Sequence, residues 1–298
     1  MSVKDTGALF LLAALWGASF LFIRVSSPAI GPVLTMELRV FIAFVVLFVY
    51  SLIFRKKLNI KRYWKQFIVI GAVNAALPFT LIAIAAIELN ASMTAILNST
   101  TPIFGALMAA IFLRESLTRG KWIGLVLGMV GVTVLMGWSQ LPLTTIVILS
   151  ALCSILAALS YGIAGVYIKK YFSGVDSLSM AVGQQLSASL LLLPFLFFFP
   201  VEANWSPTVV ISIILLGVFC TAFAFLIYFY LITEVGPTKT LSVTILVPLF
   251  GVVWGSVFLQ EKITWGTMGG LLIILCSITL ITEGRWSSLR RSRVRNSI

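Results

Sequence analysis

Two charged residues, Glu37 and Arg39, lie within an apolar stretch of the sequence that begins near Pro32. If this stretch is a helix, they lie roughly 7–10 Å along it, at about 1.5 Å per residue. Charged groups at such depth in a membrane are costly and usually face a cavity or a partner. Two positions apart, they point to different helix faces and cannot pair directly. Arg39 is therefore a candidate binding residue, or alternatively an interfacial side chain that reaches outward. Glu37 is the acid best placed to carry a proton.

Residues that perform other chemistry are missing or scattered. The sequence has no histidine, which excludes an imidazole relay, a His-metal site and a Ser-His-Asp triad. Cys153, Cys220 and Cys276 stand alone in apolar stretches, as inert packing residues do. No G-x-x-x-x-G-K-[ST] motif is present, which excludes ATP hydrolysis by that route. We therefore expect no enzyme, no catalytic or metal-binding residues and no cofactor.

The elements that must position these residues follow from composition. Sixty per cent of the 298 residues are hydrophobic and 10% are charged, with a mean hydropathy of +1.10. So few charges cannot cover a water-soluble domain. Apolar runs long enough to cross a bilayer as helices recur along the chain, and period-2 alternation is absent. The sequence predicts an all-α integral membrane protein with ten spans: 7–25, 33–54, 66–87, 92–113, 121–138, 145–168, 178–199, 208–233, 239–259 and 266–282.

The first run follows Lys4 but offers no convincing cleavage site, so we interpret it as a retained helix. With the N-terminus placed in the cytoplasm, 18 of the 21 basic residues fall on the inner side. Only Arg24, Arg39 and Lys262 lie elsewhere. This bias predicts that both termini face the cytoplasm. We interpret the basic tail, 285–298, as a membrane-surface feature rather than a nucleic-acid arm.

Two stretches of the chain are alike. Residues 67–135 align without a gap on 213–281, and the identical positions include Gly71/Gly217, Pro102/Pro248 and Glu115/Glu261. "LAAL" at 12–15 and again at 156–159 extends the correspondence upstream. The sequence thus predicts two five-helix repeats, 1–142 and 143–284. Because five is odd, the second repeat must be inverted, an architecture that recurs in alternating-access carriers.

The paired prolines mark the middle of two spans. Proline lacks an N–H and leaves the carbonyl four residues earlier unpaired, which here is that of Asn98 or Thr244. Such a carbonyl must face protein, water or ligand. We expect Pro102 and Pro248 to act as hinges beside a polar mid-membrane site; the alternative is a plain kink packed by neighbouring helices.

The two copies "PIFGALMAAIFLRESLTRG" and "PLFGVVWGSVFLQEKITWG", with "ALWGASFLFIR" in the first span, resemble the EamA domain. Two such domains form the ten-helix branch of the drug/metabolite transporter superfamily. The resemblance covers nearly the whole chain and implies transport of small metabolites, often export of amino acids. Many members have glycine before the motif glutamate, where this chain has Arg114 and Gln260.

Family pattern and polarity together select the candidate site. Trp16 and Ser19 match the family's first helix, and Arg39 matches an arginine that the family often has, which would gate the outer side or meet a carboxylate. Gln184 and Gln185 occupy about the same repeat position as Arg39. The predicted substrate-binding residues are Trp16, Ser19, Arg39, Asn74, Asn98, Thr101, Tyr161, Gln184, Gln185, Thr221, Tyr228 and Thr244.

The leading hypothesis is a secondary carrier of the cytoplasmic membrane that moves a small metabolite, an amino acid or related compound, around a central cavity. A multidrug or cation efflux carrier is the main alternative. The small four-helix relatives in the resembling superfamily use a glutamate of the first helix for such coupling, and the first span here, 7–25, has no acid. A membrane-embedded enzyme lacks the necessary residues, and a non-transporting scaffold is a third possibility. The expected partners are the solute, the lipid bilayer and, through "GLVLGMVG" at 124–131, either the chain itself or a second copy in a homodimer.

Overall fold

The fold is seen in a computed structural model that describes residues 2–138, 141–142, 144–198, 203–236, 240 and 243–295, with side chains described to Ile281. The described residues form helices and no strands: α1 (Val3–Ile30), α2 (Pro32–Ile53), α3 (Trp64–Gly71), η1 (Ala72–Ala76), α4 (Leu77–Glu88), α5 (Ala91–Asn98), α6 (Thr101–Leu113), α7 (Arg119–Gly137), α8 (Thr145–Tyr171), α9 (Ser177–Leu192), α10 (Phe195–Phe198), α11 (Pro207–Gly217), η2 (Val218–Phe223), α12 (Ala224–Val235), α14 (Val243–Leu259) and α15 (Trp265–Arg295). η1 and η2 are π-helical. Lys239 and the last three residues of the basic tail lie outside the described residues.

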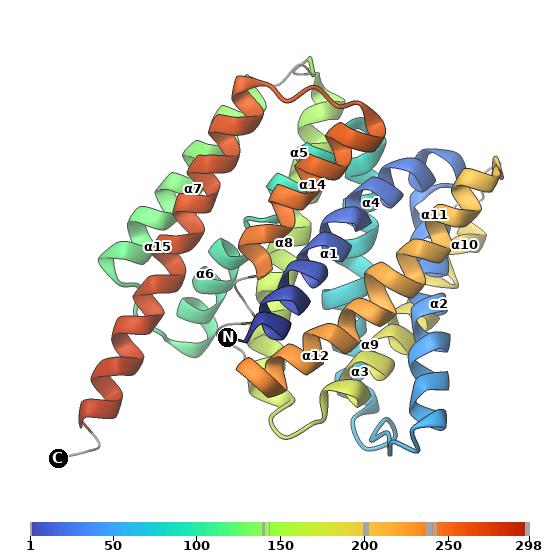
Figure 1. The fold of residues 1–298 in the computed structure, drawn as a ribbon, viewed down its shortest axis with the longest axis horizontal. Coiled ribbons are helices and arrows are strands. Elements are labelled where there is room, and N and C mark those ends of the chain that lie inside the picture. The colour runs from blue at the N-terminus through green and yellow to red at the C-terminus, as the bar shows by residue number, and fades with distance from the viewer. Residues whose placement is uncertain are drawn as a thin grey trace.

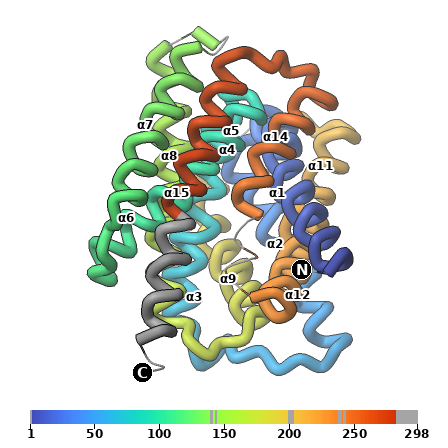
Figure 2. Tube along the Cα trace, turned by 60° about the vertical axis from the view of Figure 1, so that its left-hand side comes forward, coloured from blue at the N-terminus to red at the C-terminus, as the bar shows by residue number. Residues whose placement is uncertain are grey.

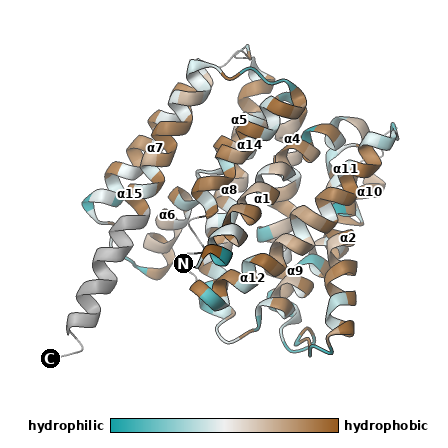
Figure 3. Ribbon diagram, in the orientation of Figure 1, coloured by the Kyte–Doolittle hydropathy of each residue, from teal (hydrophilic) through white to brown (hydrophobic). Residues whose placement is uncertain are grey.

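These elements make eight helical spans long and apolar enough to cross a membrane, and two shorter apolar helices at 243–259 and 265–281. Several spans combine elements: α3, η1 and α4 form one, α5 and α6 another, and α11, η2 and α12 a third. The predicted all-α, ten-helix membrane protein is confirmed. Figure 1 shows the bundle, and Figure 3 shows apolar residues along the outer faces of its helices. Side chains such as Met129, Phe112 and Leu272 are exposed there and would contact lipid.

The first helix is longer than its predicted span of 7–25. It begins at Val3, where Ser2 caps the first turn and Asp5 completes a capping box. The first helix therefore does contain an acid, although at its end rather than within the membrane. Asp5 accepts a hydrogen bond from Tyr230 of α12 at 3.0 Å, which ties the start of α1 to the end of α12.

Helices α7 and α15 lie side by side along one edge of the bundle (Figures 1 and 2). The glycines of the 124–131 stretch form this contact. A Cβ at Gly124 would lie 2.6 Å from Ile281, and one at Gly131 would lie 2.7 Å from Ile274. Ser277 also donates a hydrogen bond to the Gly124 carbonyl at 2.6 Å. The stretch was expected to pack either within the chain or against a second copy of the protein. In the described residues it packs within the chain, against α15.

Threonines begin the two corresponding helices that follow the repeated motifs. Thr118 accepts a hydrogen bond from the Lys121 N–H at the start of α7, and Thr264 accepts one from the Thr267 N–H at the start of α15. Both threonines are therefore N-caps. They fix where α7 and α15 begin in both halves.

The residues before the two motif glutamates adopt a left-handed backbone. Arg114 has φ of 53° and Gln260 has φ of 55°, a region where an L-residue with a Cβ is strained and glycine is not. This explains why glycine is common here among proteins of the resembling family. Arg114 and Gln260 adopt this conformation in spite of their Cβ atoms.

Gln260→Gly should stabilise the protein by about 1 kcal/mol, because glycine removes the left-handed strain, offset in part by the entropy of the unfolded chain. A thermal unfolding midpoint above that of the wild type in detergent is the expected result. Gly236 supplies the comparison, because it already holds φ of 86° and Gly236→Ala should lower the midpoint. A lower midpoint for Gln260→Gly would contradict the strain.

Candidate functional site

The two π-helical segments occupy corresponding places in the chain, beginning 146 residues apart. Each follows a glycine that packs closely on a helix of the other half. A Cβ at Gly71 would lie 2.7 Å from Ser187 of α9, and a Cβ at Gly217 would lie 2.7 Å from Ile42 of α2. π-Helical turns inside α-helices are frequent at functional sites. Because these glycines have no side chain, each π-helical turn begins at a point where the backbone lies close to a helix of the other half.

A polar contact accompanies each of these close approaches. Arg39 of α2 donates from Nε to the Thr221 hydroxyl of η2 at 3.0 Å. Asn74 of η1 donates to the Gln184 side-chain oxygen of α9 at 2.7 Å. The Thr221 hydroxyl in turn donates to the Leu216 carbonyl five residues earlier. Four residues predicted from sequence therefore form two related pairs across the halves, with Thr221 one position beyond the counterpart of Asn74, which is Cys220.

Aromatic side chains lie beside these pairs. The Arg39 guanidinium lies 3.9 Å from the centre of the Phe79 ring, and the rings of Phe79 and Tyr161 are 6.4 Å apart. The rings of Trp16 and Tyr228 are 5.5 Å apart. Phe79 belongs to a buried cluster against which Trp16, Tyr161 and Tyr228 pack. A flat or aliphatic solute group would find an apolar wall here, next to a cation.

Glu37 contacts a different helix from Arg39. One of its carboxylate oxygens accepts a hydrogen bond from Ser189 of α9 at 2.6 Å, and the other has no hydrogen-bond partner among the described residues. The Gln185 amide nitrogen also lacks a partner, while its oxygen lies 3.4 Å from the Gln184 nitrogen. No basic side chain of the described residues pairs with Glu37. The interface of α2 and α9 thus buries an acid without a cationic partner in the described part of the chain.

The first of the two proline spans is broken. α5 ends at Asn98, and Pro102 lies in the first turn of α6 after a two-residue joint. The hydroxyls of Ser99, Thr100 and Thr101 donate to the carbonyls of Ile96, Leu97 and Asn98 at 2.6–2.7 Å. The Asn98 carbonyl expected to be unpaired therefore has the Thr101 hydroxyl as its partner. The Asn98 side-chain oxygen remains buried without a hydrogen-bond partner among the described residues.

The second proline span is continuous. Pro248 is buried within α14, and Thr244 lies in the first turn of that helix. On α1, Ser19 donates to the Trp16 carbonyl of its own helix at 2.6 Å. The Thr101 hydroxyl likewise donates to a carbonyl of its own segment, that of Asn98, at 2.7 Å. The structure therefore pairs polar residues of η1 and η2 with α9 and α2. Val243 and Val247 of α14 belong to the same buried cluster as Phe79.

A second polar arrangement lies at the end of the bundle away from the start of α1, here called the distal end. Glu261, just beyond α14, accepts hydrogen bonds from the backbone N–H groups of Ala91 and Ser92 at 2.7 and 3.0 Å and from the Ser92 hydroxyl. Arg24 of α1 donates to the Ala86 carbonyl at 2.7 Å and to that of Ile87. The acid sits at a helix N-terminus and the cation at a helix C-terminus, where each is favoured. This distal clamp joins α1, α4, α5 and α14.

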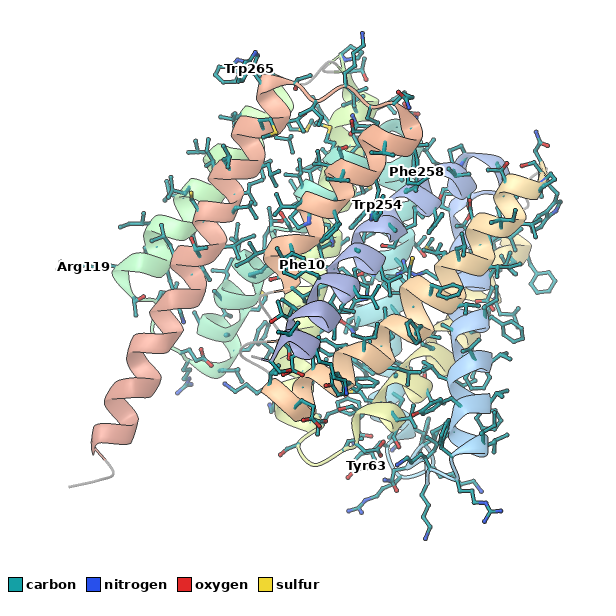
Figure 4. The ribbon with its side chains drawn as sticks, in the orientation of Figure 1. Phe10, Tyr63, Arg119, Trp254, Phe258 and Trp265 are labelled. Atoms are coloured by element: carbon teal, nitrogen blue, oxygen red, sulfur yellow. The ribbon has the colours of Figure 1, made fainter. Side chains whose placement is uncertain are left out.

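Two open cavities adjoin the distal clamp. One, of about 630 Å³, is bordered by Arg24, Val25, Pro28, Ala29, Ile87, Asn90, Leu259 and Glu261. The other, of about 830 Å³, is bordered by Ser256, Gln260, Glu261, Lys262, Ile263, Thr264, Trp265 and Met268. Trp265 points away from the bundle in Figure 4. Glu261 borders both cavities, and their linings include none of Arg39, Asn74, Gln184 and Thr221.

The corresponding residues near the other end make different contacts. Glu115, the counterpart of Glu261, accepts a hydrogen bond from Lys169 at 2.7 Å and lies 3.9 Å from Lys121. Lys169 is the counterpart of Arg24 at a separation of 145 residues. Here the acid and the base pair with each other, whereas Arg24 and Glu261 each bind helix ends. The two ends of the bundle are thus held by related residues in unlike ways.

Sequence reasoning missed Phe79, Ser189 and Arg24 as members of these sites. Phe79 carried a signal, because Phe225 stands at the corresponding position of the second half. Ser189 and Arg24 carried none, since serine and a helix-end arginine are common in membrane helices. Their partners lie 152 and more than 60 residues away, so only the fold joins them.

Comparison with known proteins gives the same pattern over the whole chain. The EamA-like transporter family matches residues 6–137 and again residues 148–283. An uncharacterized transporter of Bacillus subtilis, YoaV, is 29% identical over 283 residues, which cover 94% of this chain and 97% of that protein. An uncharacterized inner membrane transporter of Escherichia coli, YedA, is 23% identical over 94% of this chain and 91% of its own length. A crystal structure with 16% identity covers 94% of this chain with a TM-score of 0.67, which shows a shared fold.

Proposed function

Because the chain belongs to the EamA-like transporter family, we propose that it is a secondary carrier that exports a small organic metabolite, an amino acid or related compound, by alternating access. The chain is a multi-span membrane protein of a transporter family, and the solute, direction and mechanism are the proposal. We place it in the cytoplasmic membrane with both termini in the cytoplasm. The inner-membrane relative YedA and the positions of the basic residues support this placement.

The observation that carries the proposal is the pair of corresponding polar contacts between the halves, Arg39 with Thr221 and Asn74 with Gln184. Both join a π-helical turn of one half to a helix of the other half. Polar groups deep in a membrane protein mark solute or ion pathways. Sites built at the interface of two inverted repeats are exposed to either side as one repeat moves against the other.

The distal clamp and the Glu115–Lys169 pair support alternating access. They are related positions near opposite ends of the bundle, and only at the distal end do they tie α1, α4, α5 and α14 together. We propose that the described conformation is closed at the distal end, which the predicted topology places outside. Opening that end would release the Glu261 contacts.

Flux through purified protein in proteoliposomes tests the proposal. Vesicles loaded with each of the radiolabelled amino acids should lose at least one of them faster than vesicles without protein. Tetraphenylphosphonium efflux in parallel would instead favour the cation carrier. If no solute moves under any imposed gradient, the carrier assignment is wrong and a scaffold remains.

Glu37→Gln should uncouple transport from a proton gradient. We propose that the carboxyl of Glu37, buried without a cationic partner, carries the coupling proton. The variant should keep solute exchange within about twofold of the wild type, because the amide still accepts from Ser189, but should lose accumulation driven by a pH gradient. Ser189→Ala is the matched control, since it removes the hydrogen bond and leaves the carboxyl. Unchanged gradient-driven accumulation in Glu37→Gln would rule out this role.

A further inference from the structure

Arg39 is a buried cation without an anion. Its side chain is 6% exposed, and no carboxylate of the described residues lies within ion-pair distance. Its one hydrogen bond uses Nε, with the Thr221 hydroxyl as acceptor. The two terminal nitrogens therefore have no hydrogen-bond acceptor among the described residues. Leaving a buried charge uncompensated is costly, so this arrangement calls for an anionic partner beyond the described residues.

The second half of the chain provides an internal comparison. At the corresponding position Gln184 makes the same kind of contact, with Asn74 at 2.7 Å, and needs no charge to do so. A neutral amide side chain could therefore make the contact that joins α2 to η2. The charge at Arg39 adds nothing that this helix contact requires. A binding role explains why one half has a cation and the other has an amide.

The surroundings of the guanidinium favour a carboxylate over a more highly charged anion. One face of the guanidinium lies on the Phe79 ring, at 3.9 Å from its centre. The side chains of Tyr161 and Cys220 also lie near it. A planar guanidinium binds a carboxylate through two parallel hydrogen bonds. One carboxylate cancels one positive charge, whereas a phosphate dianion would leave a net charge within the membrane. The phenol of Tyr161 has no hydrogen-bond partner among the described residues and could donate to the same group.

We propose that Arg39 binds a carboxylate of the transported solute, so that the carrier acts on small carboxylic acids rather than on amines or cations. This inference rests on the proposed carrier function and specifies its substrate class. The terminal nitrogens of Arg39 hold the carboxylate, Thr221 and Phe79 fix the guanidinium, and the aromatic group of Trp16, Tyr161 and Tyr228 contacts the organic remainder.

Matched ligands test the inference on the unmodified protein. The probes are the L-amino acids, lactate and 3-phenylpropionate, each compared with its own primary amide. At least one acid should raise the unfolding midpoint of the purified full-length protein at a concentration tenfold or more below that of its amide. The amino acids test a carboxylate that is accompanied by an amino group, and lactate and 3-phenylpropionate test one that is not. Equal effects of acids and amides, or an effect of amides alone, would overturn the inference.

Two variants locate the preference at Arg39. Arg39→Gln copies the residue type found at Gln184, so it should fold and lose the tenfold preference for acids. Arg39→Lys should keep part of it, because lysine retains the charge without the planar fork. Lys262→Gln, which removes an exposed positive charge at the distal end, should retain the full preference. An unchanged preference in Arg39→Gln would assign the carboxylate to another residue.

The outcome also separates this inference from the carrier function. Transport of a neutral or cationic solute that is unaffected by Arg39→Gln would leave the carrier intact and refute the carboxylate site. Failure of every solute to move would refute both.

Discussion

Gly162→Val is expected to prevent the protein from accumulating in a folded form, while Gly165→Val, three residues further along α8, accumulates normally. A Cβ at Gly162 would lie 2.8 Å from the Phe104 carbonyl carbon and 3.0 Å from the Gly105 nitrogen. These are backbone atoms of α6, so they cannot rotate away as a side chain would. Overpacking in a core costs about 1–3 kcal/mol, and more when backbone must shift. Gly165 has no atom within 4 Å of such a Cβ and is exposed.

The measurement is the monodisperse fraction after detergent extraction together with the unfolding midpoint. The related contact in the other half gives a second test. Gly17, 145 residues before Gly162, faces Phe250 and the Gly251 nitrogen of α14 at 2.7 and 2.9 Å. Gly17→Val should be as damaging as Gly162→Val. Equal loss in Gly165→Val would show that valine in α8, rather than the α6 contact, is responsible.

Glu261→Ala is expected to open the distal end of the bundle. The variant removes three hydrogen bonds to Ala91 and Ser92, two of them to the N-terminal backbone of α5. Hydrogen bonds to a charged group contribute about 1.5–3 kcal/mol to stability. Losing that amount from the closed form would raise the open population roughly 10- to 150-fold, at 1.4 kcal/mol for each factor of ten.

Cys220 provides the readout, because it is 1% exposed and lies in η2 beside Arg39. In a background of Cys153→Ser and Cys276→Ser, a membrane-impermeant thiol reagent applied to the distal side should label Cys220 at least tenfold faster in Glu261→Ala. Lys262→Ala should label at the wild-type rate, since that side chain is exposed and neighbours the clamp. Glu261→Gln, which keeps an oxygen acceptor, should fall between. An unchanged labelling rate in Glu261→Ala would mean that the clamp does not hold this end closed.

Much of the fold could be predicted from the sequence, because apolar length alone determines a membrane span. The span predicted at 33–54 is the helix Pro32–Ile53. The joint after Asn98 could not be placed, because a proline signals a break without fixing its position. The π-helical turns could not be predicted either, since nothing in the sequence of 72–76 excludes an ordinary helix.

Predicting the candidate site was limited by distance along the chain. Arg39 and Glu37 were found because charge within an apolar run is conspicuous. Their partners Thr221 and Ser189 lie 182 and 152 residues away, and no local pattern connects them. The boundaries of the two halves at 142 and 284 stay predictions, as does the binding role of each candidate residue. Trp254 illustrates the same limit. It lies on α14 beside α1 in Figure 4 and donates to the Ala14 carbonyl 240 residues earlier.

The short joint between α5 and α6 leaves no carbonyl of Ile96, Leu97 or Asn98 dependent on solvent, because three consecutive hydroxyls of the same segment satisfy them. Rotation of α5 relative to α6 at this joint would therefore not bring water into the hydrocarbon layer. It would also not require a hydrogen-bond donor from a neighbouring helix. The continuous α14 has no such joint, so we expect the two halves to differ in flexibility here. If one half bends more easily than the other, the two conformations of the carrier would differ in free energy. The protein without solute would then favour the conformation that opens to one side of the membrane.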